Sequence, residues 1–138
     1  MTVSQVEVFQ ISLKRCLEST SFIKDFYDRF MASSDEIRAK FRGTDFERQY
    51  QMMADSLYAM AVAVRGGPNN VARLDMTRLS KRHKELAITP AMYDVWLACL
   101  LQAARVHDPF FSDVLEEAWR STLMPGIEHM RTGAPFKA

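Results

Sequence analysis

The spacing of the apolar residues constrains this chain more than any other feature of the sequence. They recur at intervals of three and four residues along most of the chain, and no convincing stretch alternates apolar and polar residues. The first spacing is typical of helices that bury one face, and strict alternation is typical of strands. A chain of 138 residues also has the usual size of one domain. We therefore expect an all-α fold in a single domain over residues 1–138, with a C-terminal tail at about 131–138 that frays.

Capping and helix-breaking residues divide this pattern into seven or so helices. Ser4 is a candidate N-cap, Ser19-Thr20-Ser21 breaks the first helix and caps the second, and Thr44-Asp45-Phe46-Glu47 matches a capping box. Proline is accepted in the first turn of a helix, so Thr89-Pro90 and Asp108-Pro109 predict two further starts. The helices expected cover about residues 3–17, 22–31, 35–40, 44–65, 71–86, 90–106 and 109–123. Gly66-Gly67-Pro68 predicts a firm stop after the fourth of these, and the fifth has a restart near Asp75. Pro125-Gly126 predicts a kink or an end in the last one.

The charge and the cysteines exclude several classes of protein. Eighteen Lys and Arg against seventeen Asp and Glu give a net charge of +1, which offers no general attraction to nucleic acid or to an anionic membrane. A helical DNA-binding regulator is therefore disfavoured, and no apolar run has the length of a membrane span. Cys16 and Cys99 lie in apolar stretches without metal-binding spacing, as buried free thiols do, and the N-terminus lacks a signal-peptide pattern. We expect a cytoplasmic protein with no nucleic-acid partner and no membrane insertion.

Three histidines are candidate ligands, and His83 differs from the other two. It takes the place of an apolar residue on the inner face of its helix, between Leu79 and Leu86. A hydrogen-bonded core histidine and a metal ligand both fit such a position. His107 falls at an expected helix end and His129 in the C-terminal region, where surface or capping roles are expected.

Two polar residues belong to the same prospective core. Tyr27 lies on a helix face otherwise rich in phenylalanine, and Gln49 lies near Met53 on the long helix that follows. A buried polar group without a partner costs about 1–3 kcal/mol, so these side chains need partners. A polar cluster in an aromatic pocket, together with a histidine on an inner face, raises the case for a ligand site.

The order and spacing of these residues resemble the bacterial three-over-three globins, in particular single-domain bacterial haemoglobins and the globin domains of flavohaemoglobins and globin-coupled sensors. The resemblance covers about Val6 to Leu123 and implies a three-over-three globin fold. The residues that carry it are Phe26-Tyr27, the run Asp35-Glu36-Ile37-Arg38-Ala39-Lys40-Phe41, Gln49, the run His83-Lys84-Glu85-Leu86-Ala87-Ile88, Tyr93 and Ala118-Trp119.

The resemblance implies haem b (iron protoporphyrin IX) as cofactor and assigns roles to residues around it. It makes His83 the proximal iron ligand, whose other ring nitrogen is expected to donate to a backbone carbonyl one turn earlier, that of Leu79. Tyr27 and Gln49 match the distal hydrogen-bonding pair, while a slip of one residue would bring Arg48 or Tyr50 inward instead. The other residues assigned to the cofactor are Phe41 packed on the haem, Met53 over its distal face, Ile88 and Tyr93 on its proximal side, and Arg82 at a propionate, with Arg42 and Lys84 behind it.

The function implied is reversible binding of a diatomic gas, either oxygen or nitric oxide. Flavohaemoglobins pair the proximal histidine with a Tyr and a Glu of the last helix, whereas the matching places here fall at Leu123 and near Ala134, so peroxidase-like chemistry is not expected. Nitric-oxide dioxygenation would need an external reductase, and a sensor would need a signalling partner. The alternative is a cofactor-free globin-fold module for signal input or interaction, its cavity filled by methionine and aromatic side chains.

Overall fold

The computed structural model describes residues 4–65, 70–134 and 136, and all regular secondary structure within them is α-helical. The all-α fold expected from the sequence is confirmed. The seven helices are α1 (Gln5–Glu18), α2 (Phe22–Ser33), α3 (Asp35–Ala39), α4 (Phe46–Arg65), α5 (Val71–Glu85), α6 (Pro90–His107) and α7 (Asp113–Thr132).

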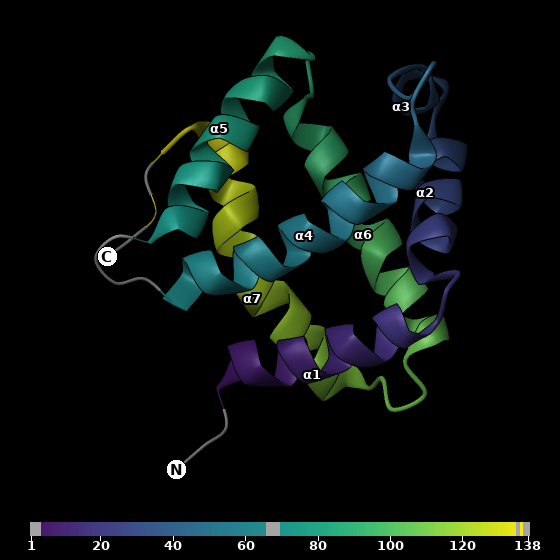
Figure 1. Cartoon of the computed structure of the whole chain (residues 1–138), viewed down its shortest axis with the longest axis vertical. Helices are drawn as coiled ribbons and strands as arrows, with labels where there is room; N and C mark the ends of the chain where they lie inside the picture. Colours follow the sequence, from purple (N-terminus) through teal and green to yellow (C-terminus); the bar gives the residue numbers. More distant parts are fainter. Residues whose placement is uncertain (1–3, 66–69, 135, 137–138) are drawn as a thin grey trace.

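The helices cross one another rather than running in parallel. In Figure 1, α1 and α4 pass in front of α7, and α2 stands beside α6. Helix α5 contacts both α4 and α7, while the short α3 contacts the end of α2. The site described below therefore draws its side chains from α2, α4, α5 and the start of α6, which are separate in the sequence.

The starts of α1, α2 and α4 agree with the sequence to different degrees. The Ser4 hydroxyl accepts the amide of Glu7 at 3.1 Å, as expected of an N-cap, whereas Ser21 precedes α2 without a side-chain capping bond. Helix α4 begins at Phe46, and the carboxylate of Asp45 accepts the Arg48 amide at 3.4 Å. The capping box assigned to Thr44 is therefore wrong by one residue, because Asp45 carries an equally good capping oxygen closer to the helix.

The corner between α6 and α7 also differs from the expectation. Asp108 does not open a helix: it is the C-cap of α6 and is 1% exposed. Helix α7 begins at Asp113, where the Ser112 hydroxyl accepts the amide of Leu115. Asp108-Pro109 has the composition of a helix start, but the carboxylate is occupied by side chains from α1, which no local pattern reveals.

The restart expected at Asp75 and the end expected at Pro125 likewise need correction. Helix α5 runs without interruption past Asp75. Helix α7 continues through Pro125 to Thr132 and ends at Gly133, whose φ of 74° suits a residue without a side chain. The glycine next to the proline has a packing reason, since a Cβ on Gly126 would lie 2.9 Å from Cε of Met60. The stop expected at Gly66-Gly67-Pro68 lies outside the described residues.

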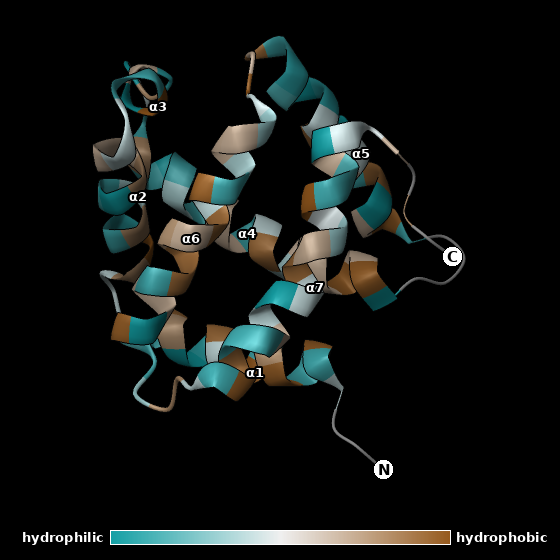
Figure 2. Cartoon of the chain, turned by 180° about the vertical axis from the view of Figure 1, so that it is seen from behind, coloured by the Kyte–Doolittle hydropathy of each residue, from teal (hydrophilic) through white to brown (hydrophobic). Residues whose placement is uncertain are grey.

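The largest fully buried side chain is Trp119, which lies where α1, α2 and α7 meet. The rings of Phe9, Phe22 and Phe111 each meet it edge-on, with centroids 4.8, 6.3 and 6.2 Å away. Figure 2 shows that each long helix carries both hydrophobic and hydrophilic residues, as the three- and four-residue spacing requires. Among the described residues no single helix has the length and hydropathy of a membrane span, and only α5 with α6, bent by 118° between them, passes that test as a pair.

Candidate functional site

His83 lies near the C-terminal end of α5, half-buried, with one ring nitrogen anchored to its own helix. Its Nδ1 lies 2.8 Å from the carbonyl oxygen of Leu79, which confirms the hydrogen bond expected from the four-residue spacing. A carbonyl only accepts, so Nδ1 carries the proton and the neutral ring has its lone pair on Nε2. Burial lowers the pKa of His83, partly opposed by the Leu79 bond, and this favours the neutral form. Nε2 bonds to no residue in the described part of the chain, which leaves it available to a ligand.

The backbone turns sharply after His83 and is hydrogen-bonded to the last turn of α5. The amide of Ile88 donates to the His83 carbonyl at 3.1 Å and the amide of Ala87 to the Lys84 carbonyl at 3.0 Å. This pair of bonds ends α5 as a Schellman motif. It places Ala87 at φ 58°, a left-handed conformation that costs a residue with a side chain about 1–2 kcal/mol. The strain is confined to the segment that follows the candidate ligand.

Tyr93 and Ile88 lie close to His83, on the side of the site opposite Tyr27 and Gln49 in the expected arrangement. The Tyr93 ring is buried, 6.2 Å from the imidazole between centroids and tilted by 30°. Burial raises the pKa of Tyr93, and the opposing charge is the cation of Arg131. Leu123 and Ala134 fall at the places where flavohaemoglobins have a Tyr and a Glu. Leu123 is fully buried, and the Ala134 carbonyl accepts a hydrogen bond from His129. Because neither side chain is ionisable, neither supplies an acid near His83.

Tyr27 and Gln49 meet as a hydrogen-bonded pair. The Gln49 amide donates from Nε2 to the Tyr27 hydroxyl oxygen at 2.9 Å, joining α4 to α2. Tyr27 is 3% exposed, and burial raises the pKa of its phenol to about 12. The phenol is therefore protonated at neutral pH, and its hydrogen goes to no acceptor among the residues described here. The pair offers one free O–H donor held in a fixed position.

Aromatic rings surround this pair. Tyr27 has Phe41 at 5.4 Å, Tyr50 at 5.6 Å and Phe46 at 6.1 Å between ring centroids. Tyr50 is half-buried beside Tyr27, but the hydrogen bond comes from Gln49, and Arg48 is exposed. Of the two residues that a one-residue slip would bring inward, only Tyr50 lies at the site. Met53, one helical turn after Gln49, is 6% exposed.

A lysine joins the two sides of the site. The Lys40 ammonium donates to the Leu86 carbonyl at 2.8 Å, linking the segment after α3 to the corner after α5. Phe41 follows Lys40 directly, and Leu86 lies three residues after His83. The bond therefore fixes the Phe41 side of the site next to the His83 side. Sequence reasoning missed Lys40 because its partner is a backbone carbonyl 46 residues away.

The remaining assigned residues lie around the same corner. Leu79 and Ile88 are half-buried. Arg82 is mostly exposed, and within the described part of the chain its guanidinium pairs with Glu85 alone, at 3.7 Å. No cluster of three or more His, Cys, Asp and Glu side chains with metal-site geometry occurs in residues 4–65, 70–134 and 136.

The other two histidines are more buried than expected. His129 is 7% exposed, bonds to the Ala134 carbonyl at 2.5 Å and stacks on Phe136. His107 bonds to Ser19 and Asp25. The surface position expected for both is wrong, because each ring also reaches a partner far away in the sequence: Thr77, at 3.2 Å from Nε2 of His129, and Ser19 and Asp25 for His107.

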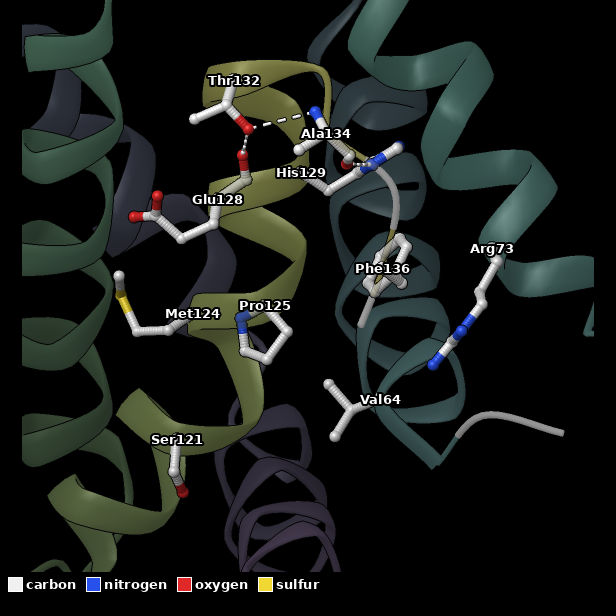
Figure 3. A pocket seen from close by; sticks show the side chains of 10 residues that line it. All are labelled: Val64, Arg73, Ser121, Met124, Pro125, Glu128, His129, Thr132, Ala134 and Phe136. Atoms are coloured by element: carbon white, nitrogen blue, oxygen red, sulfur yellow. Dashed lines mark hydrogen bonds between the residues drawn. The ribbon is translucent and has the colours of Figure 1, made fainter. Parts of the chain in front are cut away.

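His129 also lines a hollow that lies apart from the residues assigned to the haem. It has a volume of about 520 Å³ and is lined by α7, the end of α4, the start of α5 and the C-terminal segment (Figure 3). Phe136 covers one side, with the Arg73 guanidinium 5.0 Å from its ring centroid. None of the residues expected to contact haem lines this hollow.

Comparisons with known proteins give a consistent result. The family described as bacterial-like globin matches residues 18–131. Curated proteins give no significant match. Among solved structures the chain is similar to PA3967 of Pseudomonas aeruginosa PAO1, described as structurally highly homologous to a human haemoglobin, with 32% identity, a TM-score of 0.86, and coverage of 94% of this chain and 97% of that one. The helices, and a match that spans most of the chain, show that this protein belongs to the bacterial-like globin family and has the globin fold.

Proposed function

We propose that this chain binds haem b through His83 and reversibly binds a diatomic gas, oxygen above all, beside Tyr27 and Gln49. Globins are haem-binding proteins as a family, and the residues present suit that group. The observation that carries the proposal is the state of His83: one ring nitrogen is anchored to Leu79, and the other has its lone pair and no partner in the described chain. A metal-bound histidine is held in the same way.

Haem, when bound, supplies an iron atom with a coordination position open to a gas. The role of Tyr27 is to donate its O–H to the ligand there, while Gln49 holds the phenol oxygen from behind at 2.9 Å. A donor fixed in a buried site loses little energy in reorganising, so it favours a ligand that accepts hydrogen bonds, such as oxygen, over carbon monoxide. The aromatic rings around Tyr27 exclude water from this donor.

The remaining assignments follow from burial and exposure. Phe41, Met53, Leu79, Ile88 and Tyr93 supply apolar surface for the porphyrin. Arg82 suits a propionate, because its exposed guanidinium has only a weak contact to Glu85 to give up.

The test is an absorption spectrum of the full chain mixed with one equivalent of haem, in the ferric, ferrous and ferrous-carbonyl states. We expect a Soret band typical of histidine-bound haem, lost in His83→Ala and partly restored by added imidazole. His129→Gln is the matched control, since it removes a buried histidine outside the site. An unchanged spectrum in His83→Ala would reject the assignment, and failure of the wild-type chain to take up haem would favour the cofactor-free module.

A further inference from the structure

A second group of chemically capable residues lies away from the haem site, at the corner between α1 and α2. The Ser19 hydroxyl lies 2.8 Å from Nδ1 of His107, and Nε2 of the same ring lies 3.0 Å from Oδ2 of Asp25. The three residues come from the end of α1, the last residue of α6 and the first turn of α2. A nucleophile within reach of a base that a third group orients is the arrangement that activates a serine.

The proton positions favour the reactive state. Burial would raise the pKa of Asp25, but hydrogen bonds from Arg29, at 2.9 Å, and from His107 hold it below its usual value. The carboxylate is therefore ionised and only accepts, so the neutral imidazole carries its proton on Nε2. Its lone pair then lies on Nδ1 and faces the Ser19 O–H.

The surroundings fix the ring and leave the serine within reach. His107 has a side chain 13% exposed, and the ring of Phe22 meets it edge-on at 5.8 Å. Among the described residues, the charged group that contacts His107 is Asp25, whose own ion pair is with Arg29. Ser19 is half-buried, while the next two residues are exposed.

The start of helix α2, close to Ser19 in the sequence, has backbone donors that could serve a negatively charged oxygen. Helix α2 starts three residues after Ser19 and has no side-chain cap. The amides of Ile23 and Lys24 bond to no acceptor within the described residues. Free amides at a helix start stabilise negative charge.

We propose that Ser19, His107 and Asp25 form a serine nucleophile site that is acylated by small carboxylic esters. The Ser19 oxygen attacks the ester carbonyl while its proton passes to Nδ1 of His107. The ester C–O bond then breaks and the alcohol leaves with that proton. Water, deprotonated by the same imidazole, releases the acid and restores the serine. Asp25 holds the ring and stabilises its charged form.

The experiment treats the full chain, as isolated, with a fluorophosphonate probe and maps the adduct by peptide mass spectrometry. The Ser19 oxygen displaces fluoride from phosphorus and His107 takes the proton. We expect one adduct, at Ser19, absent in Ser19→Ala. The labelling rate should fall at least tenfold in His107→Gln, because a positioned general base contributes about 10²–10⁴-fold, and less in Asp25→Asn. Ser21→Ala is the control, since its hydroxyl lies 3.4 Å from that of Ser19 without contacting the histidine.

Two further measurements guard against variants that fold poorly. In the wild-type chain Ser19 should label faster than Ser21, and release of p-nitrophenol from p-nitrophenyl acetate should stop once Ser19 carries the fluorophosphonate adduct. The proposal is wrong if Ser19 labels no faster than Ser21, or if its labelling rate is unchanged in His107→Gln. The three residues would then only join α1, α2 and α6. Haem content does not enter either readout, so this outcome is independent of the gas-binding proposal.

Discussion

Two buried polar regions of this molecule are built in opposite ways. At the junction of α1, α6 and α7, Asp108 accepts two bonds from Arg15 at 2.7 and 2.9 Å, one from Ser12 at 2.6 Å and one from the Phe110 amide at 2.9 Å. Trp119 in turn donates to Ser12 at 2.9 Å. At the proposed haem site, by contrast, Nε2 of His83 and the Tyr27 hydrogen have no partner in the described chain.

The difference separates stability from function. A buried polar group without a partner lowers stability, so it persists where a ligand completes it. The closed network around Asp108 has nothing left to offer a ligand, whereas the site around His83 does. We therefore expect substitutions in the first region to change the free energy of unfolding and substitutions in the second to change gas binding.

The largest expected effect is that of Asp108→Ala. This substitution leaves Arg15 and Ser12 without their partner, and we expect a loss of about 3 kcal/mol in the free energy of unfolding. That value is near the lower end of the losses for broken buried ion pairs, because Arg15 is partly exposed. Urea unfolding at neutral pH measures this loss. Asp113→Ala, at an exposed aspartate, should change stability by less than about 0.5 kcal/mol. Equal losses in the two variants would contradict the closed-network reading.

The same carboxylate predicts a pH dependence. Burial would raise the pKa of Asp108, but its bonds from Arg15, Ser12 and the Phe110 amide hold it below the usual 3.8. The unfolded state then binds a proton more readily than the folded one, so this stabilisation is full above the ordinary pKa and is lost as pH falls through the lower, folded value. The stability difference between wild type and Asp108→Asn should stay constant from pH 7 to about 5 and shrink below that. If the stability difference between the two proteins instead grew as the pH fell, the pKa of Asp108 would be raised on folding rather than lowered, and the prediction would be wrong.

At the open site, Tyr27→Phe should change gas binding more than folding. Loss of a hydrogen bond to the ligand, about 1.4 kcal/mol, raises the oxygen dissociation rate about tenfold. Stopped-flow displacement of oxygen by carbon monoxide measures the rate. Tyr50→Phe is the matched control, because its ring lies beside Tyr27 and its hydroxyl makes no hydrogen bond to the described residues. Similar rates in wild type and Tyr27→Phe would remove the proposed donor from the site.

The smallest expected effect is at the corner behind His83. Ala87→Gly relieves the cost of φ 58° while adding freedom to the unfolded chain, so we expect a gain in stability below about 1 kcal/mol. Ala91→Gly, at an exposed helical position in α6, should instead destabilise by about 0.5–1 kcal/mol. Thermal unfolding of the two variants shows whether each substitution raises or lowers the free energy of unfolding. Destabilisation by Ala87→Gly would show that the left-handed alanine carries no strain.

The parts of the site that sequence reasoning found depend on short spacings or on family resemblance. His83 and Leu79 are four positions apart on one helix, and the spacing alone predicts their hydrogen bond. The Ser4 cap likewise joins residues three positions apart. Tyr27 and Gln49 are 22 residues apart, and their pairing came only from the resemblance to globins. Lys40 escaped because a surface lysine shows nothing of a backbone carbonyl 46 residues away.

By itself the sequence determined that the chain is helical, where most helices lie, and which face of each is buried. These properties depend on residues three or four positions apart, whose geometry a helix fixes locally. Only the tertiary structure decided that Asp108 is a buried anchor rather than a helix start, that His107 and His129 have partners, and that Lys40 ties the Phe41 segment to the corner after His83. Those outcomes depend on contacts between residues as far as 96 positions apart, where burial and charge pairing outweigh the local pattern.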